Sequence, residues 1–137
     1  MELFKGFRER RAQRTQHAEE LKRLAHELEK RMAQIEVFPG TKAEYEKYKS
    51  EKFEYIGTGI NGRNRVIAAP WENPFTGNLV VYCYNSIFEK ALSVGAEAIV
   101  QFKTFPGLFD EEAKGIPVKR QEKREVLVEL PSQFSNN

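Results

Sequence analysis

Residues 78–103 read NLVVYCYNSIFEKALSVGAEAIVQFK, and this stretch decides the fold class. It opens with seven largely apolar, β-prone residues, a composition that predicts a buried strand. Asn85 or Ser86 can cap a helix that continues through Ser93, because a short polar side chain there accepts a hydrogen bond from the first turn. Residues 98–103 then return to an apolar, β-branched pattern. The stretch therefore predicts a strand, a helix and a second strand in that order.

The N-terminal part of the chain has the pattern of one long helix. Residues 2–35 contain no proline and a single glycine, and they are rich in good helix formers. From His17 onward, apolar residues return every three or four positions, which places them on one helix face. We expect this face to mediate assembly or partner docking. Its large members are Leu21, Leu24, Leu28, Met32 and Ile35. Pro39-Gly40 ends the pattern, so residues 1–37 are predicted to form a long amphipathic helix.

The first turns of this helix carry basic residues where the apolar stripe would continue. Burying consecutive arginines would desolvate their charges, so residues 8–14 are expected to project into water. Such a helix end can contact the phosphates of a nucleic acid. The candidate phosphate contacts are Lys5, Arg8, Arg11 and Arg14. It can also lie on an anionic membrane surface with Leu3, Phe4 and Phe7 inserted between the lipids.

Local signals divide the chain beyond residue 40. Thr41-Lys42-Ala43-Glu44 matches a capping box and predicts a short helix over 42–49. After that helix the hydrophobic period changes from about 3.6 to about 2, which indicates strands. Asn61-Gly62 lies between two β-prone runs and predicts a tight hairpin turn. Residues 71–77 and 105–115 both contain Pro and Gly and are predicted to be loops.

The end of the chain completes the predicted domain. Residues 116–121 and 125–130 are expected to close the sheet as a final hairpin or strand pair, and residues 131–137 to form a flexible tail. The element order predicts an α+β domain over residues 41–130. We expect a mostly antiparallel sheet with one βαβ crossover and with helices on one face, preceded by the long N-terminal amphipathic helix.

Length and composition limit the class of protein. A chain of 137 residues with 40% hydrophobic residues predicts one compact unit. Its formal charge of +2 is too small to indicate a polyanion partner for the whole surface. A single cysteine excludes a disulfide framework and a cysteine-based structural zinc site. There is no apolar run long enough to span a bilayer and no signal-peptide pattern, so we expect a soluble, cytoplasmic protein.

No set of residues predicts catalysis, a metal or a cofactor. His17 and His26 lie on opposite sides of the long helix. Cys83 stands between two tyrosines in a predicted strand and is expected to pack as a small hydrophobe. Gln101-Phe102-Lys103 resembles a strand element of restriction-type nucleases, but that chemistry needs carboxylates to hold Mg²⁺, and the preceding strand has none. We therefore expect a non-enzymatic protein with no metal and no cofactor.

Three segments form a set that resembles a known family. They read YIGTGI at 55–60, FEKALSVGAEAIVQFK at 88–103 and GIPVKR at 115–120. Together they resemble the YbjQ-type family of small α+β proteins, which are often labelled heavy-metal binding. The resemblance covers about residues 55–120 and does not include the N-terminal helix. It implies a compact sheet-and-helix subunit that assembles into a ring-like homo-oligomer.

The predicted function is homo-oligomeric assembly or ligand binding. The chain holds more aromatic residues than a core of about 90 residues can easily bury, which points to an outer sheet face as a further contact. The residues concerned are Tyr45, Tyr48, Trp71, Phe75, Tyr82, Tyr84, Phe105 and Phe109. The alternative is a nucleic-acid-associated protein that uses the basic end of the helix.

Overall fold

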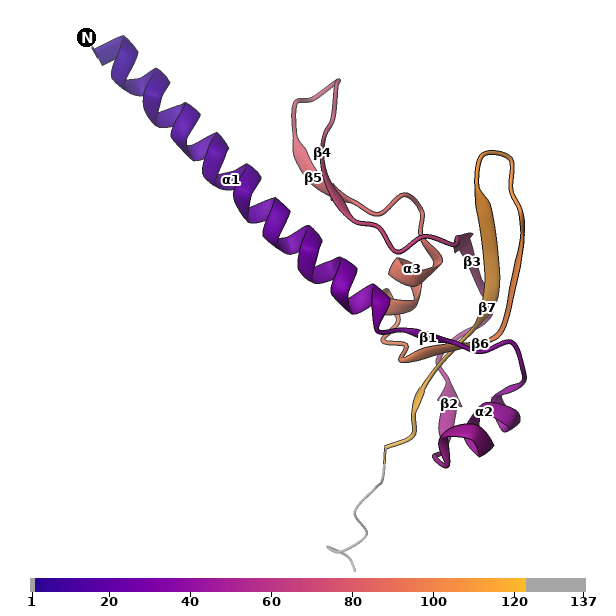
Figure 1. The fold of residues 1–137 in the computed structure, drawn as a ribbon. Helices are drawn as coiled ribbons and strands as arrows, with labels where there is room; N and C mark the ends of the chain where they lie inside the picture. Colours follow the sequence, from indigo (N-terminus) through magenta and orange to yellow (C-terminus); the bar gives the residue numbers. More distant parts are fainter. Residues whose placement is uncertain (1, 123–137) are drawn as a thin grey trace, which may run out of the picture.

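The computed structural model describes residues 2–122, and only the backbone of residues 2–5 and 7 (Figure 1). It confirms the α+β class, with a long N-terminal helix and a mostly antiparallel sheet. The elements are α1 (Glu2–Ala33), β1 (Glu36–Val37), α2 (Lys42–Lys49), β2 (Phe53–Tyr55), β3 (Ile60–Arg63), β4 (Ala69–Glu72), β5 (Leu79–Tyr82), α3 (Ile87–Ser93), β6 (Ala98–Pro106) and β7 (Glu111–Arg120).

The strands form two separate sheets. The larger sheet has the order β1-β6-β7-β2, and β3 also pairs with β7. Its parallel pair joins β1 and β6, whereas β2, β3 and β6 all run antiparallel to β7. β4 and β5 form a two-stranded antiparallel sheet that stands beside α1 in Figure 1. The two strands that flank α3 in the sequence therefore belong to different sheets.

Helices cover both faces of the larger sheet, so the prediction of helices on one face was wrong. Ile99 of β6 belongs to a buried cluster that includes Met32 of α1. Its neighbours Ala98 and Val100 belong to a second cluster, built around Tyr45 of α2. Successive side chains of a strand alternate between its faces. β6 is thus buried on both sides, which accounts for its continuous apolar run.

α1 packs on the rest of the chain through one stripe of side chains. Leu21 and Ala25 are buried on it, and Met32 is fully buried. The stripe contacts β4, β5 and α3, and burying one large apolar side chain contributes about 1.5–3 kcal/mol. Glu29 adds a polar link, since its carboxylate accepts a hydrogen bond from the backbone N–H of Ala68 at 2.9 Å.

α1 ends at Ala33, earlier than the predicted boundary at residues 35–37. The backbone that follows turns into the larger sheet. The N–H of Glu36 donates to the carbonyl of Glu97 at 3.3 Å, and that of Phe38 donates to Ile99 at 2.9 Å. These bonds with β6 replace the helical hydrogen bonds and make residues 36–37 a short parallel strand.

The predicted helix over 42–49 is confirmed as α2, together with its cap. The Thr41 hydroxyl accepts a hydrogen bond from the N–H of Glu44 at 3.3 Å. At the other end, Ser50 adopts a left-handed conformation with φ of 57°. α3 begins in the same way, because Ser86 accepts a hydrogen bond from the N–H of Phe88 at 3.1 Å.

The hairpin turn predicted at Asn61-Gly62 was wrong, because both residues lie inside β3, opposite Lys114 and Ala113. The glycine serves close packing instead. A Cβ at Gly62 would lie 2.7 Å from the carbonyl oxygen of Asn85, so the start of α3 could not approach β3 as it does. A glycine required by a distant backbone carries the same local signal as one required by a turn.

The loops predicted over 71–77 and 105–115 are shorter than expected. β4 extends to Glu72, and β6 and β7 pair as far as Pro106 and Glu111, so their connection is a turn closed by Gly107 N–H and Asp110 O at 2.9 Å. Cross-strand pairing overrides the local turn propensity of these segments. The predicted strand over 125–130 and the tail over 131–137 lie outside the described residues.

Tyr45 provides a test of the α2 packing. It is 3% exposed, and its hydroxyl donates to Glu36 Oε1 at 3.4 Å. Burial, reinforced by the Glu36 carboxylate, raises the pKa of Tyr45 to about 12.

Because of this shift, the free energy of unfolding should fall as the pH rises above about 10. The unfolded chain loses the phenolic proton there, while the folded chain keeps it until about pH 12. The full loss is about 3 kcal/mol. Urea unfolding across this pH range should show a shallower fall for Tyr45→Phe than for the native chain, and equal slopes would contradict the buried position of the hydroxyl.

Candidate functional site

The helix face predicted to mediate assembly is largely used inside the chain. Leu21, Met32 and Ile35 are at most 8% exposed, and Leu28 packs partly buried against the same cluster. Leu24 is 41% exposed. Four of the five residues therefore pack against other parts of the same chain and are not open to a partner. Leu24 is the exception.

The basic helix end, defined as residues 8–14 of α1, extends beyond the domain (Figure 1). Every side chain of residues 8–17 is exposed, and the packed stripe begins at Ala18. Arg8, Arg11 and Arg14 are all exposed, and Arg14 forms an ion pair with Glu72 of β4. The side chain of Lys5 lies outside the described residues, as do those of Leu3, Phe4 and Phe7.

A second surface lies on the β4–β5 sheet and faces away from α1. We call it the outer hairpin face; it consists of Trp71, Val80, Tyr82 and Tyr84. Trp71 and Val80 are directly opposite each other across the two strands. The rings of Trp71 and Tyr82 have centroids 5.6 Å apart, and those of Tyr82 and Tyr84 lie 4.8 Å apart. The four side chains form a continuous row.

The outer hairpin face departs from the usual pattern of a half-buried sheet. Val81 and Cys83 pack toward the core and alternate along the chain with Val80 and Tyr82. The solvent side of such a sheet is normally polar. Here Trp71, Val80 and Tyr82 are 41–43% exposed, so both sides of this sheet are apolar and only one is covered.

The predicted surplus of aromatic residues is found at the surface with one exception. Tyr45 is buried beneath α2, so its assignment to an outer surface was wrong. Phe75 is 93% exposed at the β4–β5 turn, and Phe109 is 85% exposed at the β6–β7 turn. The two turns lie at the same end of the molecule as the basic helix end in Figure 1.

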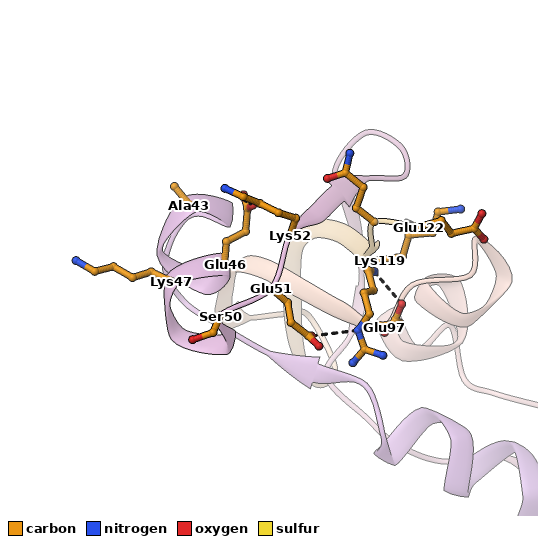
Figure 2. A pocket seen from close by; sticks show the side chains of 11 residues that line it. Ala43, Glu46, Lys47, Ser50, Glu51, Lys52, Glu97, Lys119 and Glu122 are labelled. Atoms are coloured by element: carbon orange, nitrogen blue, oxygen red, sulfur yellow. Dashed lines mark hydrogen bonds and ion pairs between the residues drawn. The ribbon is translucent and has the colours of Figure 1, made fainter. Parts of the chain in front are cut away.

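A hollow of about 1360 Å³ lies between the end of α2 and the end of β7 (Figure 2). Its charges are mostly paired with each other. Arg120 Nε lies 3.0 Å from Glu51, and Glu46 lies 3.7 Å from Lys52. A hydrogen bond from Lys42 lowers the pKa of Glu46. Paired in this way, these side chains link α2, β2 and β7 and leave little uncompensated charge for a ligand.

A second hollow of about 570 Å³ lies beside the N-terminus of α2. We call it the lysine hollow, because Lys103 of β6 and Lys114 of β7 both line it and are directly opposite each other. Like charges placed directly opposite across two strands destabilise a sheet. Within the part of the chain that the structure describes, neither lysine has an ion-pair or hydrogen-bond partner.

A β-bulge shapes the floor of the lysine hollow. Between the pairs Val100–Ile116 and Lys103–Lys114, the two residues Gln101 and Phe102 stand against Gly115 alone. Gln101 has φ of 52°, a left-handed conformation that usually selects glycine in such a bulge. A non-glycine residue there costs about 1–2 kcal/mol. Gln101 also lines the hollow, so a strained position carries a polar side chain into it.

Sequence reasoning identified Lys103 but missed Lys114 as its neighbour. Residues 105–115 looked like a loop, and the pairing of the two lysines depends on the register set by the bulge. A left-handed Gln101 has no signal in the sequence. Val80 was also missed as a surface residue, because the run at 78–84 looked buried on both sides.

The described residues contain no group of three or more His, Cys, Asp or Glu side chains that could hold a metal ion. His17 and His26 are both exposed on α1. Burial raises the pKa of the Cys83 thiol, which disfavours the reactive thiolate. The lysine hollow, which holds the nuclease-like Gln101 and Lys103, has one carboxylate among its described lining residues, Glu44, and this accepts a hydrogen bond from Thr41.

Comparison with known proteins adds no relative. No protein-family model, no curated protein and no solved structure matches this chain. Over the range that the structure describes, no helix is long and apolar enough to cross a lipid bilayer.

The bulge leads to a stability prediction. Gln101→Gly should raise the free energy of unfolding by about 0.5–1 kcal/mol, because glycine adopts a left-handed φ without steric cost. Thr104→Gly, in the same strand but without a positive φ, should lower it by about 1 kcal/mol. Chemical denaturation of the two variants measures the difference, and a similar loss in both would show that Gln101 is not strained.

Proposed function

We propose that this protein is a non-enzymatic subunit of a homo-oligomer and that the outer hairpin face is its contact surface. The observation that carries this proposal is the exposure of Trp71, Val80 and Tyr82 on one side of a sheet whose other side is packed. A contiguous exposed apolar patch on a protein surface marks an interaction site more often than chance.

A second copy of the same chain is the occupant that fits this surface best. The four residues of the outer hairpin face are uncharged, and three are aromatic, which is the composition of an interface centre. A two-fold contact places a patch against itself, so any charge within it would face its own copy. The formal charge of +2 also gives little repulsion between two approaching chains.

The family resemblance supports homo-oligomeric assembly in general and not the two-fold geometry. The segments at 55–60, 88–103 and 115–120 resemble the YbjQ-type family, and this resemblance implies a ring-like homo-oligomer. We place this assembly in the cytoplasm, where disulfides are rare; the single cysteine, Cys83, is a free thiol.

The decisive variant is Val80→Lys, because it puts a charge in the middle of the outer hairpin face. Val94→Lys is the matched control: Val94 is 44% exposed and Val80 is 41% exposed, but Val94 lies at the end of α3. Sedimentation equilibrium should show an oligomer for the native chain and for Val94→Lys, and a monomer for Val80→Lys. Circular dichroism should be the same for all three.

Trp71, the only tryptophan of the chain, gives an independent readout. Its emission should shift to shorter wavelength as the native chain becomes more concentrated, because assembly removes water from the ring. A native chain that stays monomeric at the highest concentration reached would contradict the assembly. Equal assembly of Val80→Lys and Val94→Lys would contradict the surface.

Nucleic-acid binding by the basic helix end remains the second candidate, favoured by one observation. Residues 8–17 are exposed on a helix that extends beyond the domain, so the Arg8 side chain can reach a phosphate backbone without any rearrangement. Glu9 in the same stretch and the ion pair of Arg14 with Glu72 reduce the available positive charge. For these reasons we rank it below assembly.

A titration with a random-sequence DNA duplex at several salt concentrations tests this candidate. Replacing both Arg8 and Arg11 with Gln should weaken binding and reduce the slope of log K against log salt by about 2, one for each lost phosphate contact. The control replaces Lys22 and Arg23, which are exposed on the same helix and paired with glutamates. Equal losses in both double variants, or no binding at low salt, would eliminate the candidate.

A further inference from the structure

We propose that the lysine hollow binds a small phosphorylated molecule and that Lys103 and Lys114 hold its phosphate group. The hollow is built by β3, β6, β7 and the segment that leads into α2. None of its residues belongs to the outer hairpin face, so this site does not depend on the proposed assembly.

The lysine hollow carries a net positive charge, because two lysines and one carboxylate line it. Lys103 and Lys114 project from directly opposite positions and therefore on the same side of the sheet. The described lining contains one acidic residue, Glu44, and the Thr41 hydroxyl already donates to its carboxylate at 3.3 Å. Neither lysine is ion-paired with a described residue, and the net positive charge of the hollow favours binding of an anion.

Polar side chains extend the same row on either side of the lysines. Asn61 of β3 is directly opposite Lys114, so its amide lies on the same side of the sheet. Gln101 approaches from the bulge. No hydrogen bond joins either amide side chain to another described residue. With the lysines, they provide four donor groups that lack a protein acceptor.

The backbone that positions Gln101 in the lysine hollow is itself strained. Gln101 holds a left-handed φ of 52°, and strained residues of this kind concentrate at functional sites. The bulge also requires Gly115 opposite it, since a Cβ there would lie 2.9 Å from the carbonyl oxygen of Val100 and 2.4 Å from Cγ2 of Ile99. The chain thus accommodates strain in the one strand segment that positions Gln101 beside Lys103.

A phosphate monoester matches the charge of the site better than a carboxylate does. It carries close to two negative charges at neutral pH, with a second pKa of about 6, so it can pair with both lysines at once. A monocarboxylate has a single negative charge to share between them. The volume of about 570 Å³ exceeds what a bare phosphate fills and lies within the usual range for small-molecule pockets. Pro39, Ile60 and Ile116 supply apolar lining for the body of the ligand.

The test uses the full chain, labelled with ¹⁵N, and AMP as the probe phosphate monoester. Amide signals of residues 101–103 and 114–116 should shift and saturate with AMP. Adenosine, which lacks the phosphate, should leave them unchanged. Inorganic phosphate should shift the same signals but bind more weakly, because it makes no use of the apolar lining.

Variants then assign the binding to the lysine pair. Lys103→Gln and Lys114→Gln should each weaken AMP binding about tenfold, the effect of losing one hydrogen bond to a charged group. Lys47→Gln is the matched control, an exposed lysine that lines the neighbouring hollow, and it should bind AMP as the native chain does. Glu44→Gln should bind AMP more tightly, since it removes the negative charge facing the phosphate.

Two further measurements, the stability of Lys103→Gln and the pH dependence of AMP binding, separate loss of the site from loss of the fold. Lys103→Gln should unfold no more easily than the native chain, because it removes a like-charge contact. AMP affinity should fall as the pH drops below about 6, where the phosphate keeps only one charge. Three results would overturn the site: no saturable shift with AMP, equal shifts with adenosine, or equal weakening by Lys47→Gln and Lys103→Gln.

Discussion

The burial of one stripe of α1 against the β4–β5 sheet is the contact on which the rest of this structure depends. A two-stranded sheet is at best marginally stable alone in water, and so is a helical segment with fewer than about three heptads of apolar pattern. Each covers the apolar side of the other, around Leu21, Ala25 and Met32. This packing of α1 on the β4–β5 sheet has a consequence for function. It buries the helix face that could otherwise bind a partner, and it leaves the opposite side of the sheet, with Trp71 and Tyr82, facing water.

Structural features that depend on residues close in the sequence could be predicted, whereas features that depend on distant strands could not. Thr41 and Ser86 cap their helices because a hydroxyl needs only the next turn as a partner. Gly62 shows the opposite case. Its requirement comes from the approach of Asn85, more than twenty residues away, and a local pattern cannot separate that from a turn. The two-sided burial of β6 and the bulge at Gln101 likewise follow from pairing with β7 and from α2 packing on the second face.

The same distinction applies to the candidate sites. The presence of aromatic residues at the surface could be predicted from composition, because their number does not depend on topology. The burial of Tyr45 could not be predicted in this way. The lysine hollow needed the register of β6 and β7, which brings Lys103 opposite Lys114 only after the bulge shifts the pairing. The two surfaces we propose are thus of different kinds: one is what the packing of α1 leaves uncovered, and the other is built by a strained strand.

The most direct test of the central claim is amide hydrogen exchange of the full chain at low and at high protein concentration. We expect residues 18–33 of α1 to be protected at both concentrations, because their apolar stripe is covered within one chain. Residues 69–72 and 79–82 should gain protection only at high concentration, where the outer hairpin face becomes covered by a second copy. Protection of residues 18–33 that appears only at high concentration would contradict the account, since it would mean that the helix, and not the hairpin, forms the contact between chains.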